Sequence, residues 1–306
     1  MKTALKLTLA SLLLAAPAAQ AQIEINENLS IGGFIDSSIG FGGGDTSIGV
    51  DQVEINFDLS FDGISANIDL DDENGSFGVE QANITLDLGE GSSLTAGKFL
   101  SYMGWETYDP TGLFQFSGAY AAGGMNRTLY PAHSEGIKFD IDGFGIALLD
   151  RVYGSDNGLN SEDYTEYGIE VKYSFSPAEG WNVFIGYALD VAGDRGNDDT
   201  SLINLWASYE TGIHTFAAEY SMAEVNNSDV DQLLVMWNAA ITDEGSVTAR
   251  ISQSASPYYM TDFTKYTVAY LHAVNENLTM VFELSEVDWD DSSNSTEAAI
   301  EALFTF

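Results

Sequence analysis

The feature that most constrains this chain is an alternation of apolar and polar residues that returns along most of its length. The clearest run, 53–61, reads VEINFDLSF, with apolar residues at every odd position and polar ones between them. Because successive side chains of a strand point to opposite faces, such a run predicts a strand with one apolar and one polar face. No convincing helical pattern lies between these runs.

The alternation predicts an all-β chain of about sixteen strands, with a range of about 12–18. The expected strands are 28–40, 51–61, 63–71, 76–88, 92–100, 134–141, 143–152, 164–175, 180–191, 201–210, 213–223, 230–241, 245–254, 263–273, 277–288 and 296–306.

The connections between these strands alternate between tight and long. The tight ones, several of them Asp-Gly pairs that suit hairpin turns, are 62–63, 89–91, 142–143, 176–179, 211–212, 242–244 and 274–276. The long ones are 42–50, 72–75, 101–133, 153–163, 192–200, 224–229, 255–262 and 289–295. Short turns at one end and long loops at the other are typical of outer-membrane barrels, whose periplasmic turns are short and extracellular loops long.

A sheet in lipid has to close on itself because lipid offers its backbone no hydrogen bonds. We therefore predict a closed antiparallel transmembrane β-barrel with an apolar outside and a polar lumen. The polar phase of the strands gives four acidic candidates for the lumen, Glu54, Asp58, Asp69 and Asp87. The alternative fold is a secreted, acidic β-sandwich.

The first 21 residues are expected to be removed. Lys2 and Lys6 precede a short apolar run, 7–16, and Ala19-Gln20-Ala21 forms a small-x-small cleavage site. This is the pattern of a signal peptide, so residues 1–21 are predicted to direct export and 22–306 to form the barrel domain. The expected location is the outer membrane of a Gram-negative bacterium.

The final residues, EALFTF, keep the alternation to the last position. Phe304 and Phe306 fall on one face of the last predicted strand, which we expect to close against the first strand and to meet lipid. The ending also resembles the C-terminal aromatic signal that the barrel-assembly machinery reads in bacterial outer-membrane proteins.

Charge and composition exclude several functions. The chain carries 47 acidic and 10 basic residues, so it repels nucleic acid. It has no cysteine, which excludes disulfides and thiolate metal sites. No hydrolase, phosphate-loop or zinc-protease motif is found, and His133 is expected to be structural, so no enzyme and no cofactor are predicted. Acidic loops such as Asp198-Asp199 and 288–291 allow weak Ca²⁺ or Mg²⁺ binding, although a solvated charge run is the favoured reading.

The long connection 101–133 and the strands beside it resemble the outer-membrane β-barrel porin family called OmpL-like. The resemblance rests on Gly97-Lys98-Phe99, Gly104-Trp105-Glu106, the aromatic and serine segment 116–120, Pro131, and His133-Ser134-Glu135-Gly136. An Asn-rich part of the family pattern is replaced here by Thr111-Gly112-Leu113. General porins fold their third loop into the barrel and narrow it, and this connection is the third long loop.

The resemblance implies an outer-membrane porin that passes small hydrophilic solutes and ions by passive diffusion. The acidic residues of the chain add the expectation of a preference for cations. The acidic candidates for the constriction are Glu106, Asp109 and Glu135. A ring of carboxylates at that place would attract cations and exclude anions. Basic candidates in the polar phase of their strands are Lys138, Arg151, Lys172, Arg250 and Lys265. They either face the acidic loop across the lumen or only neutralise neighbouring carboxylates.

Several alternatives stay open at this point. The loop 101–133 either enters the lumen or lies in solvent outside it. The protein is either an open pore or a surface-exposed structural or adhesin-type barrel with a plugged lumen. The expected partners are outer-membrane lipid, lipopolysaccharide, the assembly machinery, and small solutes and ions, with either a homotrimer or a monomer as the working unit.

Overall fold

The computed structural model describes residues 22–42, 45–73, 76–153, 165–192, 199–225, 228–255 and 262–306. The predicted signal peptide, 1–21, lies outside these ranges, so its assignment stays a prediction. Among the described residues, no helix is long and apolar enough to cross a membrane.

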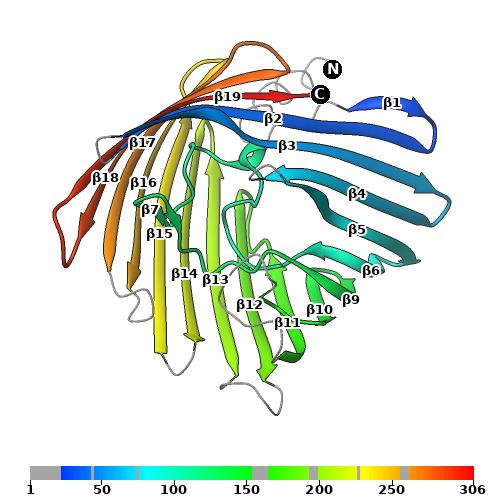
Figure 1. Cartoon of the computed structure of the whole chain (residues 1–306). Helices are drawn as coiled ribbons and strands as arrows, with labels where there is room; N and C mark the ends of the chain where they lie inside the picture. Colours follow the sequence, from blue (N-terminus) through cyan, green and yellow to red (C-terminus); the bar gives the residue numbers. More distant parts are fainter. Residues whose placement is uncertain are drawn as a thin grey trace, which may run out of the picture.

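Within the described ranges, the main sheet is an antiparallel barrel of 16 strands, each paired with its neighbours in chain order (Figure 1). They are β2 (Leu29–Gly42), β3 (Asp45–Phe61), β4 (Ile64–Glu73), β5 (Ser76–Gly89), β6 (Ser92–Leu100), β9 (His133–Ile141), β10 (Phe144–Leu149), β11 (Thr165–Phe175), β12 (Trp181–Ala192), β13 (Thr200–Thr211), β14 (His214–Val225), β15 (Ser228–Ala240), β16 (Gly245–Ala255), β17 (Phe263–Ala273), β18 (Leu278–Trp289) and β19 (Ser295–Thr305).

The last strand closes the barrel against the first, as the sequence predicted. β19 pairs with β2 from Glu297↔Gly42 to Thr305↔Phe34, and the red and blue strands lie side by side in Figure 1. Phe306 and Gly33 then exchange two backbone hydrogen bonds of 3.0 and 3.1 Å. A short strand, β1 (Ile23–Asn26), continues along the same edge of β2. The edge of β2 is therefore paired along its length, which removes an exposed edge.

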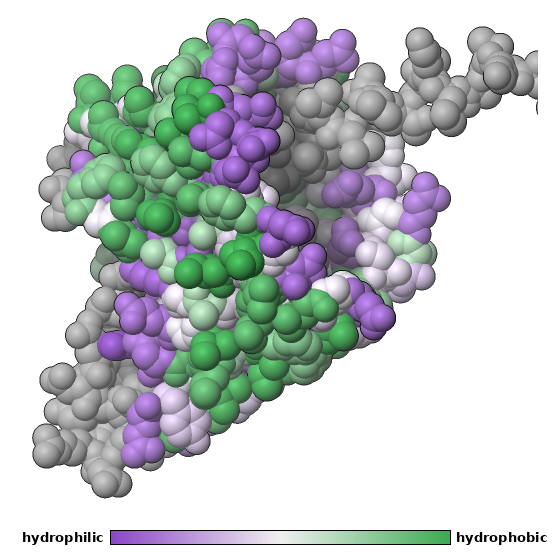
Figure 2. Space-filling view, turned by 90° about the vertical axis from the view of Figure 1, so that its right-hand side faces the viewer, coloured by the Kyte–Doolittle hydropathy of each residue, from purple (hydrophilic) through white to green (hydrophobic). Residues whose placement is uncertain are grey.

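In each strand the polar residues face the inside of the barrel and the apolar residues face the outside. This confirms the predicted barrel and shows that the alternative β-sandwich is wrong. On β14, Thr215, Glu219 and Ser221 are buried, whereas Phe216 and Tyr220 between them are exposed. Figure 2 shows apolar residues gathered in broad patches over the outer face. An apolar outside with a polar inside is the partition that lipid imposes on a wide barrel.

All the predicted strands are present, but several extend further than the alternation suggested. β2 ends at Gly42 and β3 already begins at Asp45, so the predicted long connection 42–50 is wrong. The connections predicted at 72–75 and 224–229 are also short, because β5 begins at Ser76 and β15 at Ser228. Strands can continue past the apolar band because a hairpin standing in water needs only backbone pairing and no apolar face.

Aromatic rings gather outside the barrel near the end that carries the tight turns. Tyr173 stacks on Phe175 with ring centroids 5.5 Å apart, and Trp181 stacks on Tyr209 at 4.7 Å. Such rings form the girdles of membrane barrels at the lipid–water interface. Trp289 lies elsewhere: it contacts Arg127 of the long loop, with 4.9 Å between the guanidinium carbon and the ring.

A pair of neighbouring residues on β5 tests the two-wall arrangement. Ile84 is 60% exposed on the outer wall, whereas Thr85 faces the lumen and its hydroxyl lies 2.8 Å from that of Thr95. We expect Ile84→Arg to lower the free energy of unfolding by about 2–4 kcal/mol, the cost of an Arg in the middle of the lipid face. Thr85→Arg should cost clearly less, because its guanidinium reaches the polar lumen. Urea titration of the barrel in lipid vesicles measures both, and equal losses would contradict the assignment of faces.

Candidate functional site

The long loop between β6 and β9, residues 101–132, runs through the inside of the barrel (Figure 1). It contains a short 3₁₀ turn, η1 (Pro110–Gly112), and a small hairpin of β7 (Ala121–Ala122) and β8 (Met125–Asn126). Of the two positions that the sequence left open, the structure shows the loop inside the barrel. His133, which we placed in the loop, is the first residue of β9.

Three carboxylates on the inner wall hold the backbone of the loop. Glu170 on β11 accepts hydrogen bonds from the Tyr102 amide at 3.1 Å and from Ser101 Oγ at 2.6 Å. Glu219 on β14 accepts one from the Trp105 amide at 2.9 Å. In the same way, Glu283 on β18 accepts from both the amide and the hydroxyl of Ser117, at 2.9 and 2.5 Å. Hydrogen bonds to an ionised acceptor are among the stronger ones in proteins.

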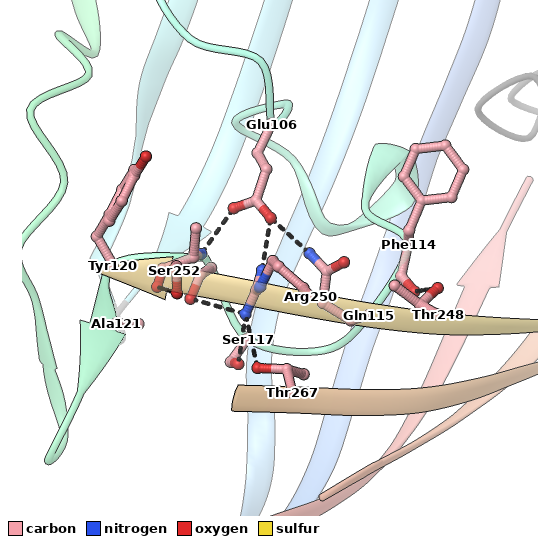
Figure 3. A network of polar contacts seen from close by, with 12 residues as sticks. Glu106, Phe114, Gln115, Ser117, Tyr120, Ala121, Thr248, Arg250, Ser252 and Thr267 are labelled. Carbon is pink, nitrogen blue, oxygen red and sulfur yellow. Dashed lines mark hydrogen bonds and ion pairs between the residues drawn. The ribbon is translucent and has the colours of Figure 1, made fainter. Parts of the chain in front are cut away.

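Arg250 on β16 is the centre of a polar network that fixes the middle of the loop (Figure 3). Its Nη1 donates to Glu106 Oε1 at 2.5 Å, and its Nη2 lies 3.3 Å from the carbonyl oxygen of Gly118. Glu106 also accepts from Gln115 Nε2 at 2.8 Å and from the Ala119 amide at 2.7 Å. The Arg250 side chain is 0% and that of Glu106 7% exposed. The pair is therefore buried, and both side chains hold the loop.

Lys265 on the neighbouring strand, β17, binds the same part of the loop. Its Nζ donates to Ser117 Oγ at 2.6 Å and to the carbonyl oxygen of Ala121 at 2.8 Å, and lies 3.9 Å from Glu297 on β19. Lys265 is buried as well. Arg250 and Lys265, two of the predicted basic candidates, therefore anchor the loop. Their charged groups contact the loop and neighbouring carboxylates.

The loop also packs on the wall through apolar contacts. One buried cluster joins Met103 and Leu129 of the loop to Phe184 on β12 and Leu202 on β13. A second joins Tyr120 of the loop to side chains of β14 and β15. The burial of apolar surface, together with the hydrogen bonds, keeps this part of the loop against the β11–β18 side of the barrel.

Burial changes the titration of tyrosines in the loop. The pKa values of Tyr120 and Tyr130 are raised well above the ordinary value, first by burial and then by the charge of Glu219, with which both hydroxyls form hydrogen bonds. The pKa of Tyr102 is raised for the same reason, with Asp140 as the nearby charge. All three hydroxyls therefore stay protonated at neutral pH and act as donors to carboxylates.

The turn at η1 reaches an acidic part of the inner wall on β3, β4 and β5. Glu54, Glu80 and Asp109 each place one carboxylate oxygen within 4.8 Å of the others. Two carboxylates about 5 Å apart repel by roughly 3 kcal/mol at an effective dielectric of about 20. Burial, and then the charges of Asp69 and Asp71, raise the pKa of Asp109 to about 6.

A second pair of basic side chains lies nearer the end of the barrel with the tight turns, beside the start of the loop. Lys172 on β11 forms an ion pair of 3.1 Å with Asp140 on β9. The Nζ atoms of Lys172 and Lys138 lie 4.9 and 5.4 Å from the centre of the Tyr102 ring. Both predicted candidates therefore face the lumen, where they are close to a carboxylate and an aromatic ring.

Two of the predicted constriction residues lie elsewhere. Glu135 is exposed and shares the outward phase of β9 with Ile137, which is 53% exposed. The prediction that Glu135 joins Glu106 and Asp109 is therefore wrong. The reason is the period of two: Glu135 and Lys138 are three positions apart, so they cannot both face the lumen of a regular strand. Arg151 lies beyond the end of β10, where its Nε contacts Asp150 at 3.0 Å.

The four acidic residues predicted for the lumen occupy two levels. Glu54 and Asp69 are buried in the acidic wall described above. Asp58 is half-buried and lines a cavity of about 740 Å³ at the end with the tight turns, with Asn67 and Asn83. Asp87 is exposed near the same end, where it accepts a hydrogen bond from the Gly89 amide.

The sequence did not single out the carboxylates that anchor the loop. In the sequence, Glu170 and Glu283 are ordinary members of the polar phase of their strands, and Glu219 lies on a strand whose alternation is weak. A signal does exist: each is an isolated acidic residue near the middle of an inward-facing phase. A carboxylate at such a place needs donors, and the amides of an inserted loop supply them.

Comparison with known proteins adds a family assignment. A family model described as Gram-negative porin matches residues 8–292. No curated protein has a sequence significantly similar to this one.

Solved structures show the same fold at low sequence identity. An anion-selective porin from Comamonas acidovorans is similar with a TM-score of 0.65 and 13% identity, over 91% of this chain and 99% of that one. OmpF from Salmonella typhi, solved with daunomycin, gives 0.70 and 14%, over 94% and 100%. OmpT from Vibrio cholerae, in a trimer form, gives 0.63 and 15%, over 91% and 99%.

The buried Arg250–Glu106 pair predicts a strong effect of one substitution. Arg250→Ala leaves the Glu106 carboxylate buried without its cation, and breaking a buried pair in this way costs about 3–5 kcal/mol. Part of that cost is avoided if the loop leaves the wall, so we expect the loop to become accessible to proteases. Limited proteolysis of the folded barrel measures this effect. The control is Arg151→Ala, whose partly exposed ion pair is worth about 1 kcal/mol or less; a loop that is equally protected in both variants would contradict the anchoring role of Arg250.

Proposed function

The chain belongs to the Gram-negative porin family, and we propose that its diffusion channel prefers cations over anions. Members of this family are channels of the outer membrane rather than enzymes, so the protein provides a passage and no residue performs chemistry. The proposal concerns what passes: small hydrophilic solutes, and cations more readily than anions.

The observation that carries the proposal is the unequal distribution of acidic and basic side chains on the inner wall. Carboxylates face the lumen from β3, β4 and β5, and Asp109 of the loop adds another on the same side. The basic side chains lie elsewhere on the inner wall. Arg250 and Lys265 are bound to the loop on the opposite wall, and Lys138 and Lys172 lie beside Asp140 and the Tyr102 ring. A narrow passage lined by one sign of charge concentrates ions of the other sign.

The fold by itself does not set this preference. The porin from Comamonas acidovorans has the same fold and is described as anion-selective. Selectivity therefore depends on the side chains of the lumen, and in this chain the total of 47 acidic against 10 basic residues works in favour of cations at the channel entrances as well.

We also propose that the chain is exported through cleavage of residues 1–21 and works as a homotrimer. The charge and small-residue pattern of the first 21 residues supports export. OmpT, which has the same fold, has been solved in a trimer form, and this supports the assembly.

Measurement of ion selectivity tests the main proposal. In a planar bilayer with a KCl gradient, the reversal potential should have the sign that potassium permeation gives. The double variant Asp58→Asn, Asp69→Asn removes two lumen charges and should move the potential towards zero. Asp62→Asn removes one charge at an exposed turn and should leave it nearly unchanged. A wild-type potential of chloride sign would refute the preference, and the absence of any conductance would favour the structural or adhesin-type barrel.

The oligomeric state has a separate test. Light scattering of the detergent-solubilised protein should give about three times the mass of the single chain after subtraction of detergent. A mass equal to one chain would contradict the trimer without affecting the selectivity.

A further inference from the structure

The carboxylates of Glu54, Glu80 and Asp109 meet at one place although they come from three different elements. Glu54 lies on β3, Glu80 on β5, and Asp109 immediately before η1 in the long loop. One oxygen from each residue lies within 4.8 Å of the other two. Asp109 follows Glu106, the partner of Arg250, by three residues, so one short stretch of the loop contacts both the Arg250 network and the acidic wall.

The three side chains have few partners of their own. Glu54 is 1% exposed; its Oε1 accepts a hydrogen bond from Asn56 Nδ2, whereas its Oε2 is buried and has no hydrogen-bond partner. A buried carboxylate oxygen without a donor is costly and calls for a ligand or a proton. Among the contacts of Glu80 is His133, whose Nδ1 lies 3.8 Å away, beyond hydrogen-bond distance.

The side chain of Asp109 also lacks the hydrogen bond that its position in the chain usually provides. It occupies the N-cap of η1, a position where an aspartate usually accepts a hydrogen bond from the first amides of the turn. Here its side chain makes no such capping bond. The carboxylate instead lies with those of Glu54 and Glu80, where it is the third acidic group.

Ca²⁺ and Mg²⁺ differ in what they require of a carboxylate site. Oxygen ligands lie about 2.3–2.6 Å from Ca²⁺, so two of them on opposite sides of the ion are about 5 Å apart. For Mg²⁺ the corresponding separation is about 4 Å, because its oxygens lie at about 2.0–2.1 Å. Oxygens that all lie within 4.8 Å of one another can therefore surround Ca²⁺. Mg²⁺ demands near-ideal octahedral geometry and gives up its water reluctantly, so three carboxylates from separate elements favour Ca²⁺.

We propose that Glu54, Glu80 and Asp109 form a Ca²⁺ site that ties the tip of the long loop to the β3–β5 wall. The opposite side of the loop is already held by Arg250 and Lys265. A bound Ca²⁺ compensates the three carboxylates and closes the second attachment, so the loop is fixed across the lumen. The site differs from the acidic loops Asp198-Asp199 and 288–291, and it does not depend on the ion selectivity of the channel.

A spin label on the loop tests the site directly, and the chain has no native cysteine to interfere. Thr111→Cys places a nitroxide in η1, two residues from Asp109. Addition of CaCl₂ to the folded barrel in lipid should broaden its spectrum, and MgCl₂ should do so much less. Asp109→Asn and Glu80→Gln, each in the labelled background, should raise the Ca²⁺ concentration for half of the effect by about tenfold or more, as expected for loss of a ligand.

Two controls separate a specific site from general attraction to an acidic protein. Asp58→Asn removes the same charge from β3 outside the site and should leave the Ca²⁺ response unchanged. A label at Met125→Cys, on the exposed β8 hairpin, should show no response.

An absent Ca²⁺ response, or equal responses in Asp109→Asn and Asp58→Asn, would overturn the site. The three carboxylates would then be neutralised by protons that they share. The reversal potential in KCl, measured on the same preparations, reports separately on selectivity. Failure of the Ca²⁺ site and failure of the cation preference are therefore distinguishable.

Discussion

The whole arrangement depends on one constraint: a β-sheet in lipid has to satisfy every backbone donor and acceptor within itself. β19 meets this requirement by pairing with β2, Phe306 extends the pairing to Gly33, and β1 covers the remaining edge. Once the sheet is closed, the period of two assigns each side chain to a wall. Phe216 and Tyr220 face outwards, and Glu219 between them faces a lumen that a long loop enters.

The inner wall uses its carboxylates in two different ways. On β11, β14 and β18, Glu170, Glu219 and Glu283 accept hydrogen bonds from the amides of the loop, so their charges hold structure. On β3 and β5, Glu54 and Glu80 meet no such donors and face Asp109 instead. The same residue type thus anchors the loop on one side and forms an acidic cluster with Asp109 on the other. Because Arg250 and Lys265 are bound on the anchoring side, the electrostatic asymmetry of the lumen follows from how the loop is held.

This division links the stability of the loop to the properties of the channel. Apolar clusters and buried ion pairs hold the loop strongly on the side of β11 to β18, and these contacts are independent of solutes. On the acidic side, the attachment of the loop rests on the Ca²⁺ site that we propose at Glu54, Glu80 and Asp109.

The sequence by itself determined the wall: the strands, the tight turns, the closing pair and the inward phase of Arg250 and Lys265 could all be predicted, because alternation and turn chemistry are local properties. The error at Glu135 was avoidable by the same rule, since its separation from Lys138 is odd. Only the tertiary structure decided the path of the loop. Arg250 and Glu106 are 144 residues apart, and Glu283 and Ser117 are 166 apart. No local pattern records such pairs, because their meeting depends on the closure of the whole barrel and on packing inside it.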